Sequence, residues 1–249
     1  LTTSQITRPD ARTVRVDASI VTSIVAVTAN AGGDTQNDTV AIDVNGLPAN
    51  IGGNVTISAE TINVNSDISS DGDITLNGGS AIAAAQTLTA ANVHLNGTVA
   101  LGANNLTVNV SNGGQSTGGI SGTGGVIKQG AGAWTMNGTG MNANTYTGLT
   151  HVQAGQVDVG GSFATDGGIV GNVTIDSGAT LRLTQDNIVG NGSDFTIEGT
   201  LNMNGRAEVL GNLQGAGTIS NHSNNGTTGL TLDDLNGTHT FTGDISGGG

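Results

Sequence analysis

Short strand-like runs follow one another along most of the chain at intervals of five to eight residues, and this spacing constrains the fold more than any other feature. Apolar and polar residues alternate within each run, as in Val55–Ile57 and Ile74–Leu76, which indicates half-buried β-strands. Gly, Asn, Asp and Ser, which favour turns, bound the runs. Every third run extends one series, in which Val55, Ile74 and Val93 stand 19 residues apart. Three short strands per repeat of about 20 residues are typical of a solenoid.

We therefore predict an all-β fold, a right-handed parallel β-helix with three short strands per coil, over residues 50–249. Each strand would stack about 4.8 Å from the strand one coil below, so that Val55, Ile74 and Val93 form one inward column. The right hand follows from the crossover rule for parallel strands. About a dozen coils would give a rod on the order of 55–60 Å long. A β-sandwich is the competing fold, but its turn signals would recur roughly every 8–12 residues, a longer interval than this sequence has.

Two segments depart from this pattern. Residues 1–49 are less rich in glycine, and we interpret them as less regular N-terminal strands that form a cap or a junction. The stretch from Ala81 to Ala91, "AIAAAQTLTAA", has the strongest helix propensity in the chain. Its flanks alternate as strands do, so we predict a strand there too.

Glycine and asparagine are expected at the corners of the coil. The chain has 43 glycines, and a corner needs a residue that tolerates positive φ or a tight bend. We expect Gly130 and Gly148 to occupy such corners. Asparagines at equivalent corners can stack as ladders of hydrogen-bonded side chains.

Composition limits the classes of partner. Apolar residues make up 35% and aromatic residues 2% of the chain, which predicts a thin core of small aliphatic side chains. The low charged fraction, 10%, argues against disorder. The net charge of −13, with only six Lys and Arg, disfavours nucleic acid; three of the six are Arg8, Arg12 and Arg15. The sequence contains no run of 18 apolar residues, so no transmembrane helix is predicted. The absence of cysteine is compatible with export in an unfolded state.

The stretch Gly122–Gly161, "GTGGVIKQGAGAWTMNGTGMNANTYTGLTHVQAGQVDVGG", resembles the passenger-associated strand repeat of bacterial autotransporters. That repeat reads G-x-G-x-L-x-K-x-G-x-G-x-L-x-L, a polar link, and N-x-Y-x-G-x-T-x-V-x-x-G-x-L-x-V. The matching residues are Gly122, Gly124, Lys128, Gly130, Gly132, Asn144, Tyr146, Gly148, Thr150, Val152, Gly155 and Val159. Trp134 and Val157 stand where that family has leucine, and the link "NGTGMNA" is longer. We interpret Trp134 as an apolar inward residue.

The resemblance extends over about residues 50–249. The segment at 53–78, "GNVTISAETINVNSDISSDGDITLNG", is similar to the coils of filamentous-haemagglutinin-like proteins. The resemblance implies a β-helix that is exported to the bacterial cell surface. It does not imply one activity, because such passengers include adhesins, proteases and esterases.

No catalytic, cofactor-binding or metal-binding residues are predicted. The histidines, which are His94, His151, His222 and His239, lack the spacing of a metal site. No serine lies in a GxSxG elbow. A carbohydrate-active β-helix enzyme, the alternative function, would need clustered carboxylates. The close carboxylate pairs are Asp71 with Asp73 and Asp233 with Asp234, and turn formation explains both.

Three other binding modes stay open. The segment Gly32–Asp38, "GGDTQND", and the residues around Asp71 could offer oxygen ligands to calcium. Eleven Asn-x-Ser/Thr triplets are potential glycosylation sites, among them those at Asn54, Asn96, Asn172, Asn225 and Asn236. An Asn corner before a Thr-containing strand generates the same triplet. An ice- or mineral-binding face would need an unbroken array of outward threonines, and Asn63, His94 and Ala100 are expected to interrupt it.

We predict an extracellular structural or adhesive segment, such as an adhesin stalk, a biofilm matrix component or a fibre subunit, and not an enzyme. "STGGISGTGG" around Ile120 resembles "FTGDISGGG" around Ile245, so a further copy of the motif would begin where the sequence stops. The expected partners are therefore further coils of the same rod or neighbouring copies placed end to end, with residues 1–50 meeting the exposed end. Host or matrix glycans or proteins are the other expected partners.

Overall fold

The computed structural model describes residues 39–42, 50–138, 143–160, 167–222, 229–233 and 238–248, and the backbone alone at 6–10, 13–16 and 27–28. All regular structure within these ranges is β-strand. The strands of the N-terminal half are β1 (Ile6–Asp10), β2 (Thr13–Val16), β3 (Val27–Thr28), β4 (Thr39–Ile42), β5 (Asn50–Ile51), β6 (Val55–Val64), β7 (Ile68–Ser70), β8 (Ile74–Ile82), β9 (Gln86–Leu95), β10 (Val99–Gly102), β11 (Leu106–Ser116) and β12 (Ile120–Gly122). Those of the C-terminal half are β13 (Val126–Gln129), β14 (Ala133–Met136), β15 (Thr150–Val152), β16 (Gln156–Val159), β17 (Val173–Ile175), β18 (Thr180–Leu183), β19 (Phe195–Ile197), β20 (Thr200–Asn202), β21 (Glu208–Leu210), β22 (Leu213–Gln214), β23 (Thr218–His222), β24 (Leu230–Leu232) and β25 (Asp244–Gly248).

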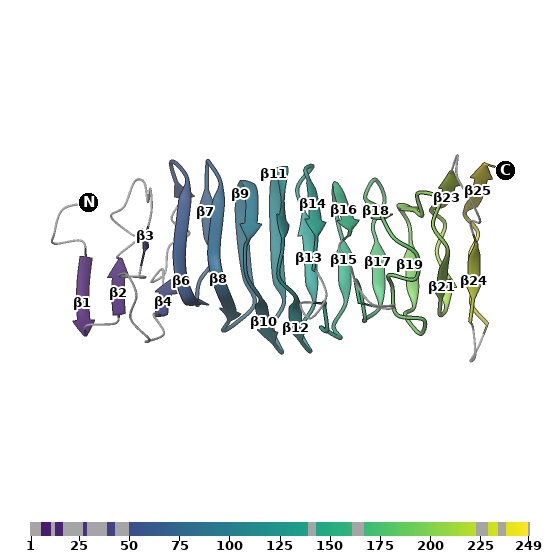
Figure 1. Cartoon of the computed structure of the whole chain (residues 1–249). Coiled ribbons are helices and arrows are strands. Elements are labelled where there is room, and N and C mark those ends of the chain that lie inside the picture. Colours follow the sequence, from purple (N-terminus) through teal and green to yellow (C-terminus); the bar gives the residue numbers. More distant parts are fainter. Residues whose placement is uncertain are drawn as a thin grey trace.

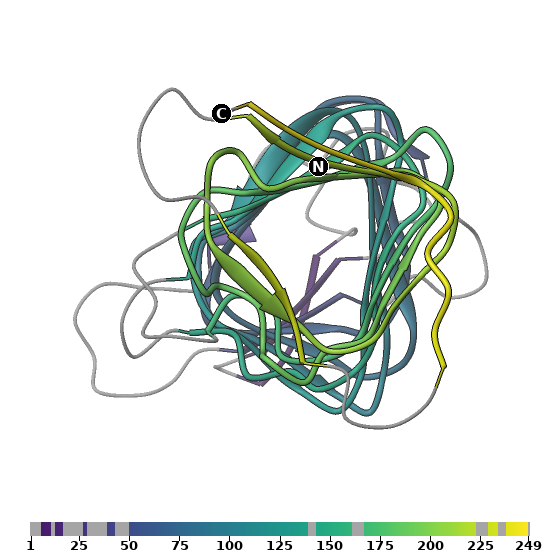
Figure 2. The same cartoon turned by 90° about the vertical axis from the view of Figure 1, so that its right-hand side faces the viewer.

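The strands wind into a solenoid of about nine turns. Figure 1 shows them side by side along one axis, in sequence order from the purple end to the yellow end. The view along that axis shows each turn wrapping around one common interior (Figure 2). The predicted all-β parallel solenoid is therefore confirmed, and the hand of the coil stays a prediction.

The strand segments lie on three parallel faces of the solenoid, which we call faces A, B and C; among the described residues, face B has no strand between β12 and β21. Face A runs through Val55, Ile74 and Val93. Face B runs through Ile62, Ser80, Val99 and Ile120. Face C runs through Ile68, Leu88 and Val108. Some strands turn a corner and serve two faces, as β6 does through a register shift between Ser58 and Thr61. The prediction of three strand segments per coil is confirmed for the turns from β6 to β12.

The predicted inward column is also confirmed. Val55 pairs with Ile74, Ile74 pairs with Val93, and all three side chains are buried. The stretch from Ala81 to Ala91 is mostly strand, as predicted, because β8 ends at Ile82 and β9 begins at Gln86. Three alanines between these strands form an exposed bend.

The expected dozen coils was an overestimate, because several turns are longer than 20 residues and their lengths vary. The register advances by 19 residues from Val55 to Ile74, by 24 from Val157 to Leu181 and by 26 from Ile219 to Ile245. Longer connections between strands consume the additional residues without adding a turn.

The core column of face A contains one large aromatic residue, and a glycine makes room for it. Gly114 pairs with Val93, and Trp134 occupies the same column one turn further on. Trp134 is buried, as expected, and its indole Nε1 donates to the carbonyl of Val93 at 3.2 Å, two turns below. A Cβ on Gly114 would lie 2.0 Å from that same carbonyl oxygen. The indole therefore covers the level at which Gly114 provides no side chain.

Strands before residue 50 continue the ladder. β4 pairs in parallel with β6, and β2 pairs in parallel with β4. β1 pairs with β2 in the antiparallel sense, unlike every other strand pairing among the described residues. Whether residues 1–49 act as a cap or a junction stays a prediction.

The two corner glycines differ in the reason for which glycine is needed. Gly130 has φ of +75°, as expected for a left-handed corner. Gly148 does not have positive φ, so that part of the expectation was wrong. A Cβ on Gly148 would instead lie 2.3 Å from the carbonyl oxygen of Gly124, because consecutive turns approach each other closely there.

We predict that Gly130→Ala and Gly148→Ala each lower the free energy of unfolding by roughly 1–3 kcal/mol, the first through backbone strain and the second through a steric clash. Gly192→Ala is the matched control, since no atom lies within 4 Å of the added Cβ and the residue does not have positive φ. The control should change stability by no more than about 1 kcal/mol. Chemical denaturation of the three variants measures this, and equal effects at all three positions would contradict the corner assignment.

Candidate functional site

A lysine occupies an aliphatic position of the core. Along face C, Val108 pairs with Lys128, and Lys128 pairs with Val152. Lys128 is 1% exposed. Its Nζ donates to the carbonyl oxygens of Gln129 at 2.7 Å, Gly130 at 2.9 Å and Ala154 at 3.2 Å.

These contacts give Lys128 a structural role. An ammonium group has three donors, and three carbonyls accept from them. Ala154 lies on the next turn, so the side chain ties one corner of the coil to the corner above. Burial lowers the pKa of Lys128 to about 8. No nucleophilic role follows, because the amine is enclosed by its own backbone acceptors.

A second buried polar group replaces backbone hydrogen bonding on face B. Asn144 is buried, and its Oδ1 accepts from the backbone N–H of Ile120 at 2.9 Å. Its Nδ2 donates to the carbonyl of Gly168 at 2.8 Å on the following turn. The amide thus bridges two turns in the manner of a strand backbone.

Tyr146 completes this buried polar region. Its hydroxyl lies 2.5 Å from Thr150 Oγ1, and both residues are buried. Burial raises the pKa of Tyr146 far above its usual range, and the hydrogen bond to Thr150 offsets part of that rise. Tyr146 therefore stays neutral and packs as a core residue.

Glu208 is buried on the C-terminal part of face B. Its Oε2 accepts from the backbone N–H groups of Ile188 at 2.9 Å and Val189 at 3.3 Å, and its Oε1 accepts from its neighbour Val209 at 3.2 Å. The carboxylate therefore ties β21 to the turn below, which is a structural role like that of Asn144.

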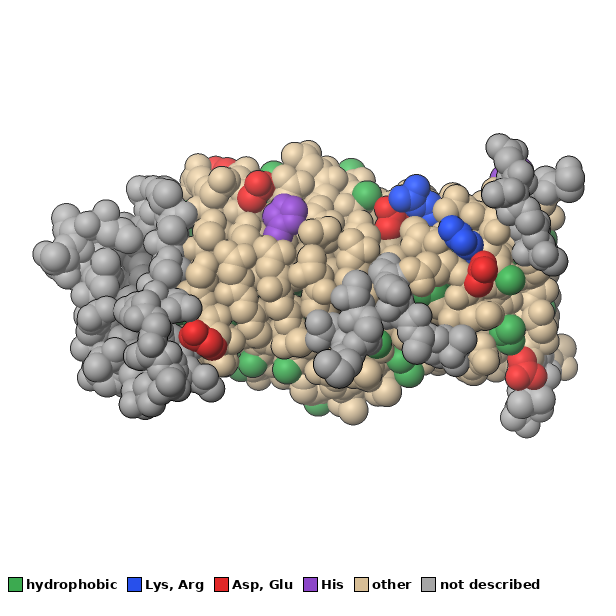
Figure 3. Space-filling view, viewed as in Figure 1, with side chains coloured by type: hydrophobic (Ala, Val, Ile, Leu, Met, Phe, Trp, Pro, Cys, Tyr) green, Lys and Arg blue, Asp and Glu red, His purple; other side chains and the backbone are tan. Residues whose placement is uncertain are grey.

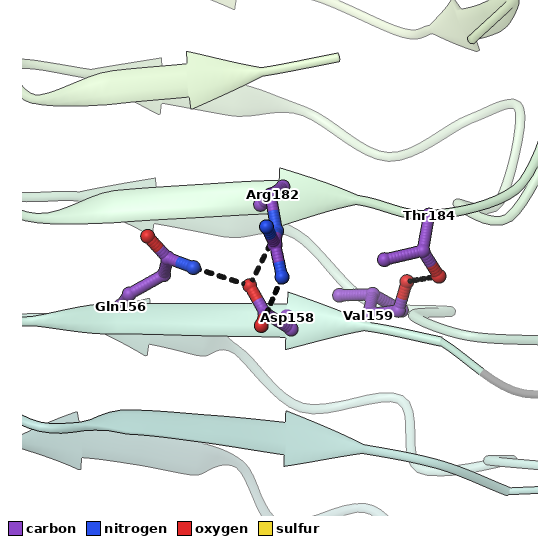
Figure 4. A network of polar contacts seen from close by, with 5 residues as sticks. All are labelled: Gln156, Asp158, Val159, Arg182 and Thr184. Atoms are coloured by element: carbon purple, nitrogen blue, oxygen red, sulfur yellow. Dashed lines mark hydrogen bonds and ion pairs between the residues drawn. The ribbon is translucent and has the colours of Figure 1, made fainter. Parts of the chain in front are cut away.

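The outer side of face A carries an ion pair between turns. Arg182 Nε donates to Asp158 Oδ1 at 2.9 Å, and Arg182 Nη2 donates to Asp158 Oδ2 at 2.6 Å. Gln156 also donates to Asp158 Oδ1, at 2.6 Å. Figure 4 shows that the three side chains come from two adjacent strands, β16 and β18. The bidentate geometry engages both carboxylate oxygens, so that Asp158 joins β16 to β18.

A chain of polar side chains crosses the outer side of face C. Gln129 donates to Gln153 at 2.7 Å, Gln153 Nε2 lies 3.4 Å from His151 Nδ1, and His151 Nε2 lies 2.8 Å from Asp176. In a catalytic triad, a His–Asp pair activates a nucleophile through the second ring nitrogen. Here that nitrogen, His151 Nδ1, faces the amide of Gln153, which is not a nucleophile. The arrangement links three turns through side-chain contacts.

The expected side-chain ladders are present. Asn96 donates to Asn77 at 2.9 Å, and Asn77 donates to Ser58 at 3.0 Å. At the corners, Asn54 accepts from the backbone N–H of Asp73 at 2.9 Å and Asn172 accepts from that of Asp194 at 3.0 Å. These contacts support the interpretation that an Asn at a corner, followed by a Thr-containing strand, generates the Asn-x-Ser/Thr triplets. Asn54, Asn96 and Asn172 are exposed, whereas Asn225 and Asn236 lie outside the described residues.

The structure does not bring the other sequence candidates together. His94 lies between Thr75 and Gln115 in the outward row of face A, where it interrupts the threonine array as expected. Asn63 and Ala100 lie on face B. Asp71 accepts from Asn50 and Asp73 accepts from Asn92, each at 2.7 Å, as turn aspartates do. His222, His239 and Asp233 are exposed, and Asp234 and Gly32–Asp38 lie outside the described residues.

No group of three His, Asp or Glu side chains among the described residues could hold a metal ion. The described part of the chain also contains no helix of the length and hydrophobicity needed to cross a bilayer. Comparison with protein-family models, curated proteins and solved structures finds no match to this chain.

Sequence reasoning missed the inward polar residues Lys128, Asn144 and Glu208. Lys128 could have been placed, since the alternation from Val126 sets it on the inward side of its strand. The inward positions of Asn144 and Glu208 could not have been predicted. Each side chain bonds to the backbone of another turn, and the position of that turn depends on connections of irregular length.

We predict that Lys128 makes stability depend on pH. Its folded pKa of about 8 lies below its unfolded value, so charging the amine opposes folding, and this cost declines as pH rises from 7 toward 10.5. Between pH 7 and 9.5 the wild type should gain roughly 2 kcal/mol relative to Lys128→Met, which has no titrating group there. Tyr146 opposes this gain only as pH rises beyond about 10. Urea denaturation across this range measures the difference, and a constant or falling difference would contradict it.

Proposed function

We propose that the chain is an extracellular structural or adhesive β-solenoid segment of a secreted bacterial surface protein, serving in an adhesin stalk, a matrix or a fibre. The observation that carries this proposal is the continuous parallel ladder of the rod. Many of its outward side chains are Thr, Asn, Gln or Ser, and several bond to a side chain one turn away, as those of Asn77, Asn96 and Gln129 do. A rod of this kind functions through stiffness and through display of its faces.

The autotransporter resemblance supports the same proposal. Residues that match the passenger-associated strand repeat occupy inward positions of the coil, since Lys128, Tyr146, Thr150 and Val152 are all buried. Asn144 also has a defined task in bridging two turns. This fit favours an autotransporter-like passenger, and with it a location at the bacterial outer surface.

The enzyme alternative gains no specific support. Asp158 is held by Arg182, and Glu208 is held by backbone N–H groups. Glycoside hydrolysis needs two carboxylates at one scissile bond, whereas Asp71 and Asp73, which are close in sequence, each accept from an asparagine of another turn. We therefore propose no catalytic role for the segment.

The proposed partners include further coils of the same rod or a neighbouring copy. Ile245 on β25 pairs with Ile219 on one side, and its side chain is 61% exposed. Among the described residues, β25 has a single strand neighbour, β23. An edge of this kind can accept a further parallel strand.

Antibodies raised against the 249-residue chain provide the test. We expect them to label intact cells of the bacterium that carries the gene, and we expect external protease to remove that signal. A cytosolic protein probed on the same cells is the control for lysis. Labelling that requires permeabilised cells would contradict the proposal.

A further inference from the structure

Charge is distributed unevenly along the rod. Residues 74–157, which we call the neutral band, contain no Asp or Glu and a single Lys or Arg, Lys128. That lysine is buried. Residues 1–73 carry nine acidic side chains and residues 158–249 carry ten. In Figure 3 a mostly tan stretch separates red side chains near the N-terminal end from blue and red ones toward the C-terminal end.

Within the neutral band, face A presents two ordered polar rows. One row, the neutral row, consists of Thr75, His94, Gln115 and Thr135, which are successive register partners on β8, β9, β11 and β14. Beside it lie Asn77, Asn96, Thr117 and Asn137, on successive turns. Asn96 donates to Asn77 at 2.9 Å, and Asn137 donates to Gln115 at 3.4 Å. These contacts fix the amides before any ligand arrives, which lowers the entropy cost of binding.

The absence of carboxylates makes close contact with the band feasible. Burying an ionised carboxylate without a partner is very costly, whereas amides and hydroxyls can be buried if they find hydrogen bonds. An interval of 84 residues without an acidic side chain, in a chain of net charge −13, therefore offers a surface that a neutral ligand can cover without burying a carboxylate.

The chemistry of the band selects the class of partner. An anionic polymer would need exposed cations, but Lys128 is buried and Arg182, beyond the band, is paired with Asp158. To bind a protein partner, the band would need exposed aromatic or Arg side chains as anchors. Trp134 and Tyr146 are inside the coil, and Leu149 is the one large apolar residue that the described part of the band exposes.

We propose that face A of the neutral band binds a neutral polysaccharide that lies along the rod axis; this rests on the adhesive function proposed above. Each turn, about 4.8 Å from the next, presents a hydroxyl, amide or imidazole group that can donate or accept. A sugar polymer carries hydroxyls that repeat along its length and can pair with such a row. The acidic segments on either side of the band repel anionic polymers and leave neutral ones unaffected.

The test uses calorimetric titration of the full 249-residue chain with soluble dextran, galactomannan and cello-oligosaccharides, and with alginate and polygalacturonate as anionic polymers. We expect at least one neutral polymer to bind and the anionic polymers not to bind. Gln115→Glu, which places a carboxylate in the neutral row, should weaken binding at least tenfold. Asn202→Asp is the matched control, because Asn202 follows Arg182 in the same outward row beyond the band.

Thr75→Glu serves as a second variant if Gln115→Glu does not fold, as judged by circular dichroism. The proposal is overturned if no neutral polymer binds, if anionic polymers bind as well as neutral ones, or if the folded band variants bind like the wild type. Surface labelling of cells without polymer binding would remove this inference and leave the proposed function intact.

Discussion

The structure depends on one repeated interaction, the parallel backbone ladder that joins each turn to the next. Because the strands are parallel and in register, a residue type chosen for one turn meets its equivalent one strand spacing away. Inward positions then form apolar columns such as Val55, Ile74 and Val93, and outward positions form ladders such as Ser58, Asn77 and Asn96. A chain with few aromatic residues can be stable in this arrangement, because every turn covers the apolar residues of its neighbours.

The ladder also decides where polar residues can enter the interior. Where the regular backbone pairing ends, buried side chains take its place. Asn144 accepts from Ile120 and donates to Gly168, and Glu208 accepts from the N–H groups of Ile188 and Val189. Lys128 satisfies three carbonyls at a corner. These residues hold together turns in which the backbone ladder is less regular.

Much of this fold could be predicted from the sequence, because period-two alternation and the 19-residue spacing both reflect the ladder directly. The column through Val55 followed from those two signals, whereas the inward place of Trp134 followed from its alignment with a leucine of the passenger-associated strand repeat. The number of turns did not, since the connections beyond Val157 vary in length and leave no periodic trace. Gly148 was misjudged for a related reason: its need for glycine comes from the closeness of Gly124 on another turn, which a local rule about φ does not contain. The contrast in charge between the neutral band and its flanks is present in the sequence, but it acquires meaning only when face A brings Thr75, His94 and Gln115 into one row.

The register of face A can be tested by disulfide trapping, because the chain contains no cysteine. Thr56 and Thr75 are register partners on adjacent turns, and His94 lies one turn beyond Thr75. A disulfide needs Cα atoms within about 4.4–6.8 Å, which one strand spacing satisfies and two do not. We expect the double variant Thr56→Cys/Thr75→Cys to form an intramolecular disulfide under native, oxidising conditions, as mapped by mass spectrometry, and Thr56→Cys/His94→Cys not to form one. Equal trapping of both pairs, or trapping of the second pair alone, would contradict the parallel in-register ladder.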